Sequence, residues 1–210
     1  LRAEIEAEVP ETVPGGIFAL GGYAGGVGLY VALFPQEQKR TSNTEWTLAD
    51  GMTRIPESQA PNVRCGNLRA EIEAEVPENV NGVIFALGGY AGGVSLYALD
   101  GELYYEYSAL LLKRYKVKAG PLPAGKVEIA FEMRTPPERA AAAEVKFWIN
   151  GEETASGTVE RTVPLTFTAS ETFDIGSDTN SPVADDYFEE APFRFEGTLS
   201  KIHFKNLKDQ

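Results

Sequence analysis

The chain has 210 residues, of which 43% are hydrophobic and 24% are charged, proportions that are ordinary for a folded domain and unlike those of a disordered chain. Acidic residues outnumber basic ones by 31 to 19, and the resulting net charge of −12 argues against nucleic acid and anionic membrane as partners, because both require a basic surface. A single Cys and a single His exclude a disulfide framework, a Cys-rich metal site and most Ser–His and Cys–His catalytic chemistry.

The N-terminal part of the chain is a near copy of a later segment. Residues 1–30 align with residues 68–97, and the two copies are identical at 26 of 30 positions. The four differences, with the first copy written first, are Thr12/Asn79, Pro14/Asn81, Gly16/Val83 and Gly28/Ser95. A near-identical pair of this kind is not a solenoid, which would repeat several times with looser identity.

The copies diverge directly after the repeat, and this divergence suggests a division of the chain. We interpret residues 1–39 as a partial duplicate strand pair, residues 40–67 as a connecting segment, and residues 68–210 as the complete domain. The extra strand pair has an apolar face that needs a partner, so we expect it to pair with a sheet edge of its own chain or of another copy, as in a strand-exchanged homo-oligomer.

Strand-like alternation of apolar and polar residues dominates the second part of the chain. We predict strands, in chain order, over residues 69–76, 83–87, 95–99, 102–109, 126–133, 144–149, 152–156 and 193–204. Two of the connections are two-residue hairpin signals, Asp100-Gly101 and Asn150-Gly151. No long amphipathic helix is found, so the predicted fold class is all-β, an antiparallel β-sandwich or jelly roll.

Several separate blocks of the sequence resemble one protein family. They are TRIPESQAPNVR (53–64), the segment from AEIEAEVPE to YYEY (70–107), PLPAGKVEIAFEM (121–133), the segment from VERTVPLTF to VADDY (159–187) and PFRFEGTLSKIHF (192–204). Together and in this order they are similar to the C-terminal accessory region of the long bacterial arylsulfatases. The resemblance implies a concanavalin A-like jelly roll that packs on, or assists, a sulfatase catalytic domain absent from this chain.

The catalytic motif of the sulfatases is itself missing. Cys65 and Arg69 have the spacing of that motif, but Asn67 stands where it requires Pro. The resemblance therefore implies a non-catalytic piece of a sulfuric ester hydrolase. The first residues show no signal-peptide pattern, the chain looks like a fragment of a longer protein, and the single Cys favours a reducing, cytoplasmic setting.

A run of alternating glutamates offers an alternative, catalytic interpretation. Glu71, Glu73 and Glu75 share one strand face, as the carboxylates of laminarinase-like glycosidases do, and Glu71 and Glu75 would then be the catalytic pair. Retaining glycosidases need their carboxylates about 5–5.5 Å apart. Residues four apart on a straight strand are separated by about 13 Å, so the run fits a solvated strand face better unless the strand bends strongly.

Two further groups suggest a lectin-like module, our second alternative. Asp174, Asp178 and Asp185 lie in an oxygen-rich segment of the kind that holds Ca²⁺, although Asx-turns explain the same residues. Tyr90 and Tyr105 are candidates for an aromatic platform under a sugar ring, although packing in the core explains them as well. No cofactor other than calcium is expected.

Overall fold

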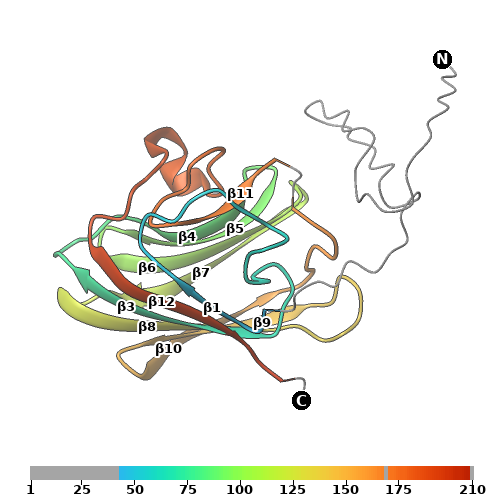
Figure 1. Cartoon of the computed structure of the whole chain (residues 1–210), viewed down its shortest axis with the longest axis horizontal. Helices are drawn as coiled ribbons and strands as arrows, with labels where there is room; N and C mark the ends of the chain where they lie inside the picture. The colour runs from blue at the N-terminus through green and yellow to red at the C-terminus, as the bar shows by residue number, and fades with distance from the viewer. Residues whose placement is uncertain (1–42, 168–169, 209–210) are drawn as a thin grey trace, which may run out of the picture. The chain divides into compact units, whose positions relative to one another are not determined.

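The predicted alternation becomes two stacked antiparallel sheets in a computed structural model, which describes residues 43–167 and 170–208 (Figure 1). Each sheet has six strands, and we name the sheets after a central strand. The β3 sheet has the order β1 (Glu45–Leu48), β12 (Thr198–Asn206), β3 (Leu68–Val76), β8 (Gly125–Arg134), β9 (Ala143–Ile149) and β10 (Glu152–Val159). The β5 sheet has the order β2 (Ile55–Pro56), β11 (Thr172–Ile175), β4 (Gly82–Gly89), β5 (Gly92–Leu99), β6 (Glu102–Ala109) and β7 (Lys113–Pro121). The antiparallel β-sandwich is confirmed.

The period-2 pattern of each strand decides which residues enter the core. In β3 every second residue from Leu68 to Val76 is buried, while the glutamates between them are exposed. Aromatic rings from both sheets meet in the space between: Phe85 of β4 lies 6.0 Å from Phe131 of β8, and Phe131 stacks on Tyr105 of β6 at 5.3 Å. These large side chains supply much of the apolar area that folding buries.

The outer face of the β5 sheet is covered by a further layer. Residues 177–196, which we call the cover segment, include the short 3-10 helix η1 (Asp185–Glu190) and pass over β4 and β5 (Figure 1). A second apolar cluster joins this segment to the sheet, and its fully buried members include Val83, Tyr97 and Tyr187. The β5 sheet is therefore apolar on both faces over part of its area, which explains the unbroken burial of β4 and most of β5.

The hairpin turns follow their sequence signals in two places and depart from them in a third. Asp100-Gly101 and Asn150-Gly151 both have positive φ at their two central residues, as a type I′ turn requires. The β6–β7 connection has three residues, Leu110 to Leu112, and its first two, both leucines, also have positive φ, of 53° and 61°. Leucine rarely adopts this conformation, so the sequence gives no hairpin signal there.

Two strands lie in the segment that the sequence analysis assigned to a connection. β1 and β2 precede Leu68 and form one edge of each sheet, so the sandwich includes residues before the predicted domain start. The predicted duplicate strand pair, residues 1–39, lies outside the described residues. Within the described part of the chain, no helix has the length and apolar character needed to cross a membrane.

Candidate functional site

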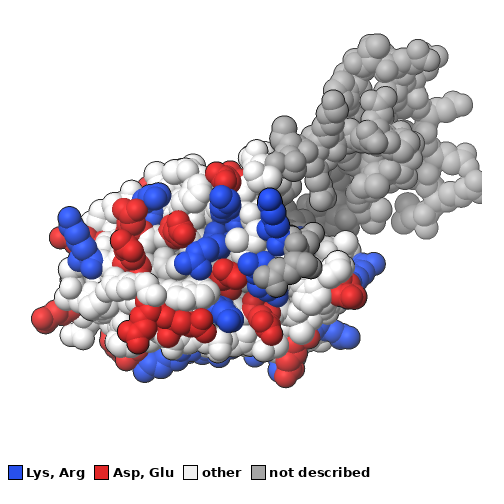
Figure 2. Space-filling model, turned by 90° about the horizontal axis from the view of Figure 1, so that it is seen from below, with Lys and Arg blue, Asp and Glu red and all other residues white. Residues whose placement is uncertain are grey.

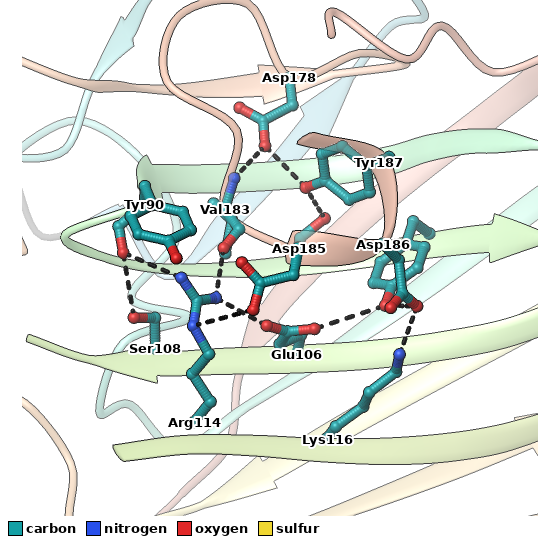
Figure 3. A network of polar contacts seen from close by, with 12 residues as sticks. Tyr90, Glu106, Ser108, Arg114, Lys116, Asp178, Val183, Asp185, Asp186 and Tyr187 are labelled. Carbon is teal, nitrogen blue, oxygen red and sulfur yellow. Dashed lines mark hydrogen bonds and ion pairs between the residues drawn. The ribbon is translucent and has the colours of Figure 1, made fainter. Parts of the chain in front are cut away.

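A network of charged and aromatic side chains lies on the outer face of the β5 sheet, beside the cover segment (Figure 3). Strand alternation sends Glu106 and Ser108 of β6 to this face, because their neighbours Tyr105 and Tyr107 point into the core. Arg114 of β7 stands directly opposite Ser108 in the ladder, and Lys116 stands opposite Glu106. The register of one hairpin thus brings two cations beside a buried carboxylate.

The guanidinium of Arg114 is the centre of this network. Its Nη1 donates to Glu106 Oε1 at 2.7 Å and to the carbonyl of Val183 at 2.6 Å, and its Nη2 donates to the carbonyl of Tyr90 at 3.2 Å. The carboxylate of Asp185 lies 3.8 Å from its Nε. Arg114 therefore ties two strands, the β4–β5 turn and the cover segment together with one planar group.

Two aromatic side chains remain exposed next to Arg114. The Tyr90 ring lies 4.4 Å below the guanidinium carbon, in cation–π geometry, and the ring of Phe188 from η1 meets it edge-on at 5.2 Å. Tyr90 is 37% exposed and Phe188 is 44% exposed. The backbone of Tyr90 is held by Ser181 Oγ, which accepts from its N–H, and by the Ser108 hydroxyl, which donates to its carbonyl. We call Tyr90 and Phe188 the aromatic platform.

A second ion pair closes the other end of the network. Lys116 donates to Asp186 of η1, and the Tyr97 hydroxyl donates to the same carboxylate at 2.8 Å. Lys116 also lies 4.9 Å above the ring of Tyr104, which stacks on Tyr97 at 5.7 Å. The side chains in this part of the network contact one another, so the aromatic platform is the part of the network that remains exposed to solvent.

The carboxylates of the network differ in their proton affinity. Burial raises the pKa of Glu106 above its ordinary value, against the opposing effect of Arg114. Burial also acts to raise the pKa of Asp186, but the hydrogen bonds from Lys116 and Tyr97 outweigh it, and that pKa lies below its ordinary value. Desolvation by burial raises the pKa of Tyr97 far above its usual range, so its hydroxyl keeps its proton and donates.

Two of the aspartates predicted for calcium instead fix the cover segment. The carboxylate of Asp178 accepts from the Val183 N–H at 2.8 Å and from the Tyr187 hydroxyl at 2.7 Å, and burial raises its pKa to about 6. Asp174 accepts from the N–H groups of Arg54 and Thr179. In residues 43–167 and 170–208, no three Asp, Glu, His or Cys side chains form a group suited to a metal ion. The calcium prediction rests on the sequence pattern alone.

The structure separates the two predicted platform tyrosines. Tyr90 lies at the open part of the site, near Asp185, whereas Tyr105 is fully buried between Phe131 and Phe147. The prediction of Tyr105 as a sugar-binding residue is wrong, because strand alternation turns its ring into the core. Sequence reasoning missed Arg114 and Phe188; the run of alternating basic residues in β7 was the only signal for Arg114.

The alternative catalytic pair lies on the opposite face of the sandwich. Glu71 and Glu75 are exposed on β3, whose ladder with β8 runs without a bulge from Leu68 to Val76. A regular strand separates residues four apart by about 13 Å. This distance is larger than the carboxylate spacing of retaining glycosidases, about 5–5.5 Å, and that of inverting glycosidases, about 6.5–9.5 Å. Figure 2 shows acidic and basic side chains interleaved on the face that is seen from below. Glu73, which lies between the two glutamates on β3, pairs with Lys201 at 3.3 Å. The glutamate run fits a solvated strand face.

Comparison with known proteins relates the chain by fold alone. No family model matches the sequence, and no curated protein is significantly similar to it. Similar solved structures include the CBM40 module of a Ruminococcus gnavus IT-sialidase bound to α2,3-sialyllactose, with a TM-score of 0.52 and 15% identity over 79% of this chain and 91% of that one. A leech intramolecular trans-sialidase has a TM-score of 0.51 and 13% identity over 79% of this chain. The mouse laminin α1 domains LG4-5 have a TM-score of 0.52 and 14% identity over 79% of this chain.

The described sandwich therefore has an antiparallel, concanavalin A-like β-sandwich fold. The chain spans only 26% of the leech enzyme and 43% of the laminin chain, whereas it spans most of the CBM40 module. Sequence identities this low establish a shared fold, and function depends on the residues of the site.

Proposed function

We propose that this chain is a non-catalytic carbohydrate-binding module that binds a sugar on the aromatic platform of Tyr90 and Phe188, beside Arg114 and Asp185. The proposal rests on the exposed ring of Tyr90. Two hydrogen bonds fix the Tyr90 backbone, and the Arg114 guanidinium lies over one face of the ring. The fold supports it, since a module of the same fold is bound to sialyllactose in its solved structure.

The residue types at the platform match what a saccharide presents. The C–H face of a pyranose ring is apolar and stacks on aromatic rings, while its hydroxyl groups need donors and acceptors at the rim. Asp185 supplies an acceptor, because its side chain is 62% exposed and only loosely paired with Arg114 at 3.8 Å. The network fixes the platform before a ligand arrives, so little conformational freedom is lost on binding.

A glycan array followed by calorimetric titration tests this proposal. We expect Tyr90→Ala to abolish binding, Tyr90→Phe to retain most of it because the ring remains, and Leu165→Ala, an exposed apolar residue elsewhere, to leave it unchanged. Titration with and without a chelator tests whether calcium takes part. Failure of the wild-type chain to bind any sugar, or equal binding by Tyr90→Ala, would refute the proposal.

We further propose that the module belongs to a larger arylsulfatase-like enzyme. The ordered sequence blocks that resemble the accessory region of these enzymes support this proposal, and the absence of the Pro-containing sulfatase motif at Cys65 supports a non-catalytic role. The reading frame upstream of Leu1 is expected to encode the catalytic domain. Turnover of an aryl sulfate by this chain alone would contradict the proposal.

A further inference from the structure

The two copies of the repeat share all of the residues that face the core. Residues 68–97 form β3, β4 and β5 up to Tyr97, and we call the place that they occupy the three-strand position. Its buried residues toward the core are Leu68, Ala70, Ile72, Ala74, Val76, Val80, Ile84, Phe85, Leu87, Val94 and Leu96. Each of these has the identical residue 67 positions earlier in the chain. By its core-facing residues alone, the first copy would fill the three-strand position as well as the second.

Two of the four differences fall in the turn between β3 and β4. Asn79 has φ of 54°, a conformation that asparagine tolerates and that the β-branched threonine of the first copy disfavours. Asn81 donates its N–H to Glu196 at 2.9 Å and accepts from the Asp100 N–H at 2.8 Å through its side chain. The first copy has proline at this position, which has neither the N–H nor the amide.

The other two differences fall where the cover segment is attached. Val83 is fully buried in the outer apolar cluster, beside Phe193, and its N–H donates to the Phe193 carbonyl at 2.9 Å. The buried Ser95 hydroxyl is hydrogen-bonded to the Tyr187 hydroxyl at 2.9 Å. The first copy has glycine at both positions, so it lacks the valine side chain and the serine hydroxyl.

We infer that the four differences make the three-strand position selective for the second copy, and that converting them allows the first copy of another chain to enter it. The differences affect contacts with Asp100 and with the cover segment, including Glu196, all outside the repeat, and none affects the core face. The first copy therefore matches the core but not the outer layer. The strand-exchanged oligomer suggested by the repeat is disfavoured in the wild-type chain for this reason.

The covalent connection between the second copy and β6 also favours the second copy in the three-strand position. The second copy continues into β6 through the two-residue Asp100-Gly101 turn, which closes a very short loop. A first copy from the same chain would have to close a much longer loop, at a larger entropic cost. Entry from a second chain avoids that loop and makes the exchange depend on protein concentration.

The test is the full chain carrying Thr12→Asn, Pro14→Asn, Gly16→Val and Gly28→Ser, which makes the two copies identical and leaves residues 43–210 untouched. Light scattering after gel filtration, over a wide range of concentrations, measures the association of the chains. We expect the wild-type chain to be monomeric, and the variant to dimerise with an association constant at least about tenfold higher, equivalent to about 1.4 kcal/mol.

A fifth substitution, Ile5→Asp, separates strand exchange from other association. Ile5 corresponds to Ile72, which is 1% exposed in the core, so aspartate there prevents the first copy from entering the three-strand position. We expect Ile5→Asp to abolish dimerisation of the fourfold variant. A fourfold variant that does not dimerise, a dimer that survives Ile5→Asp, or a wild-type dimer that Ile5→Asp dissociates would overturn the inference. None of these results depends on sugar binding.

Discussion

Burial of the ionised Asp178 carboxylate lowers the free energy of unfolding, and a single substitution should remove this destabilisation. Asp178 is 2% exposed, and one of its oxygens accepts from both the Val183 N–H and the Tyr187 hydroxyl. The amide of asparagine has the same shape, and its oxygen also accepts two hydrogen bonds. Asp178→Asn therefore keeps both contacts to the cover segment and removes a buried negative charge.

The magnitude follows from the shift in pKa. Burial raises the pKa of Asp178 from 3.8 to about 6, so the folded chain binds this proton more tightly than the unfolded chain does. The free energy of unfolding then falls as the pH rises from about 4 to about 6, and it is constant above pH 6. The fall is about 1.4 kcal/mol per unit of pKa shift, or about 3 kcal/mol in total. Asp178→Asn does not titrate, so we expect it to be more stable than the wild type at neutral pH by up to that amount.

Urea unfolding at a series of pH values between 4 and 8 measures this difference. The advantage of Asp178→Asn should be largest above pH 7 and should shrink to a small remainder at pH 4, because the folded wild-type carboxyl is then protonated and the unfolded one is about half protonated. Asp178→Ala is the matched control: it also removes the charge, but it leaves the Val183 N–H and the Tyr187 hydroxyl without their acceptor and should lower stability. An advantage that is absent at neutral pH, or independent of pH, would refute the reasoning.

Substitutions at three further places test the packing around the site. The Tyr105 hydroxyl is buried with no hydrogen-bond partner within the described ranges, so Tyr105→Phe should raise the unfolding free energy by about 1 kcal/mol and leave sugar binding unchanged. Replacing Leu110-Leu111 by Asn-Gly should add about 1–2 kcal/mol in urea unfolding, because both leucines have positive φ; a loss would show that their side chains stabilise the fold. Arg114→Ala should cost about 3 kcal/mol and weaken sugar binding, and adding Glu106→Gln should restore part of the stability by removing the unpaired buried charge. If the double variant is no more stable than Arg114→Ala, the ion pair is not the cause.

Alternation along single strands was enough to predict the central elements of the fold. β3, β8 and the two Gly-containing hairpins agree with the sequence analysis because each depends on residues adjacent in the chain. β7 was missed because its basic residues obscure the inward-facing Tyr115 and Val117, and because the Leu110-Leu111 turn before it has no turn residue.

The site was harder to predict, because its residues are brought together only by sheet register. Alternation assigns Tyr104 and Tyr105 to opposite faces, but it does not say which face is the core. Arg114 contacts Tyr90 from 24 residues away and Val183 from 69 residues away, and no sequence pattern connects the three. Asp178 lies in a loop, as the sequence predicted, whereas Asp174 lies in β11; the hydrogen bonds that both accept from backbone N–H groups identify them as supports of the cover segment.

The position of the open platform follows from how far the cover segment extends. Val83, Ala86 and Tyr97 make the outer face of the β5 sheet apolar, and without residues 177–196 this face would be exposed to water. The segment covers β4 and β5. It reaches β7 through the ion pairs of Arg114 and Lys116 and the hydrogen bond from Arg114 to the Val183 carbonyl, and Tyr104 of β6 packs against the outer apolar cluster. Tyr90 lies in the turn between β4 and β5, where the cover is incomplete, so its ring is both exposed and rigidly held. The segment that closes the second apolar layer thus also supplies Ser181 and Phe188, which contact Tyr90, and loss of the cover segment would remove both the layer and the platform.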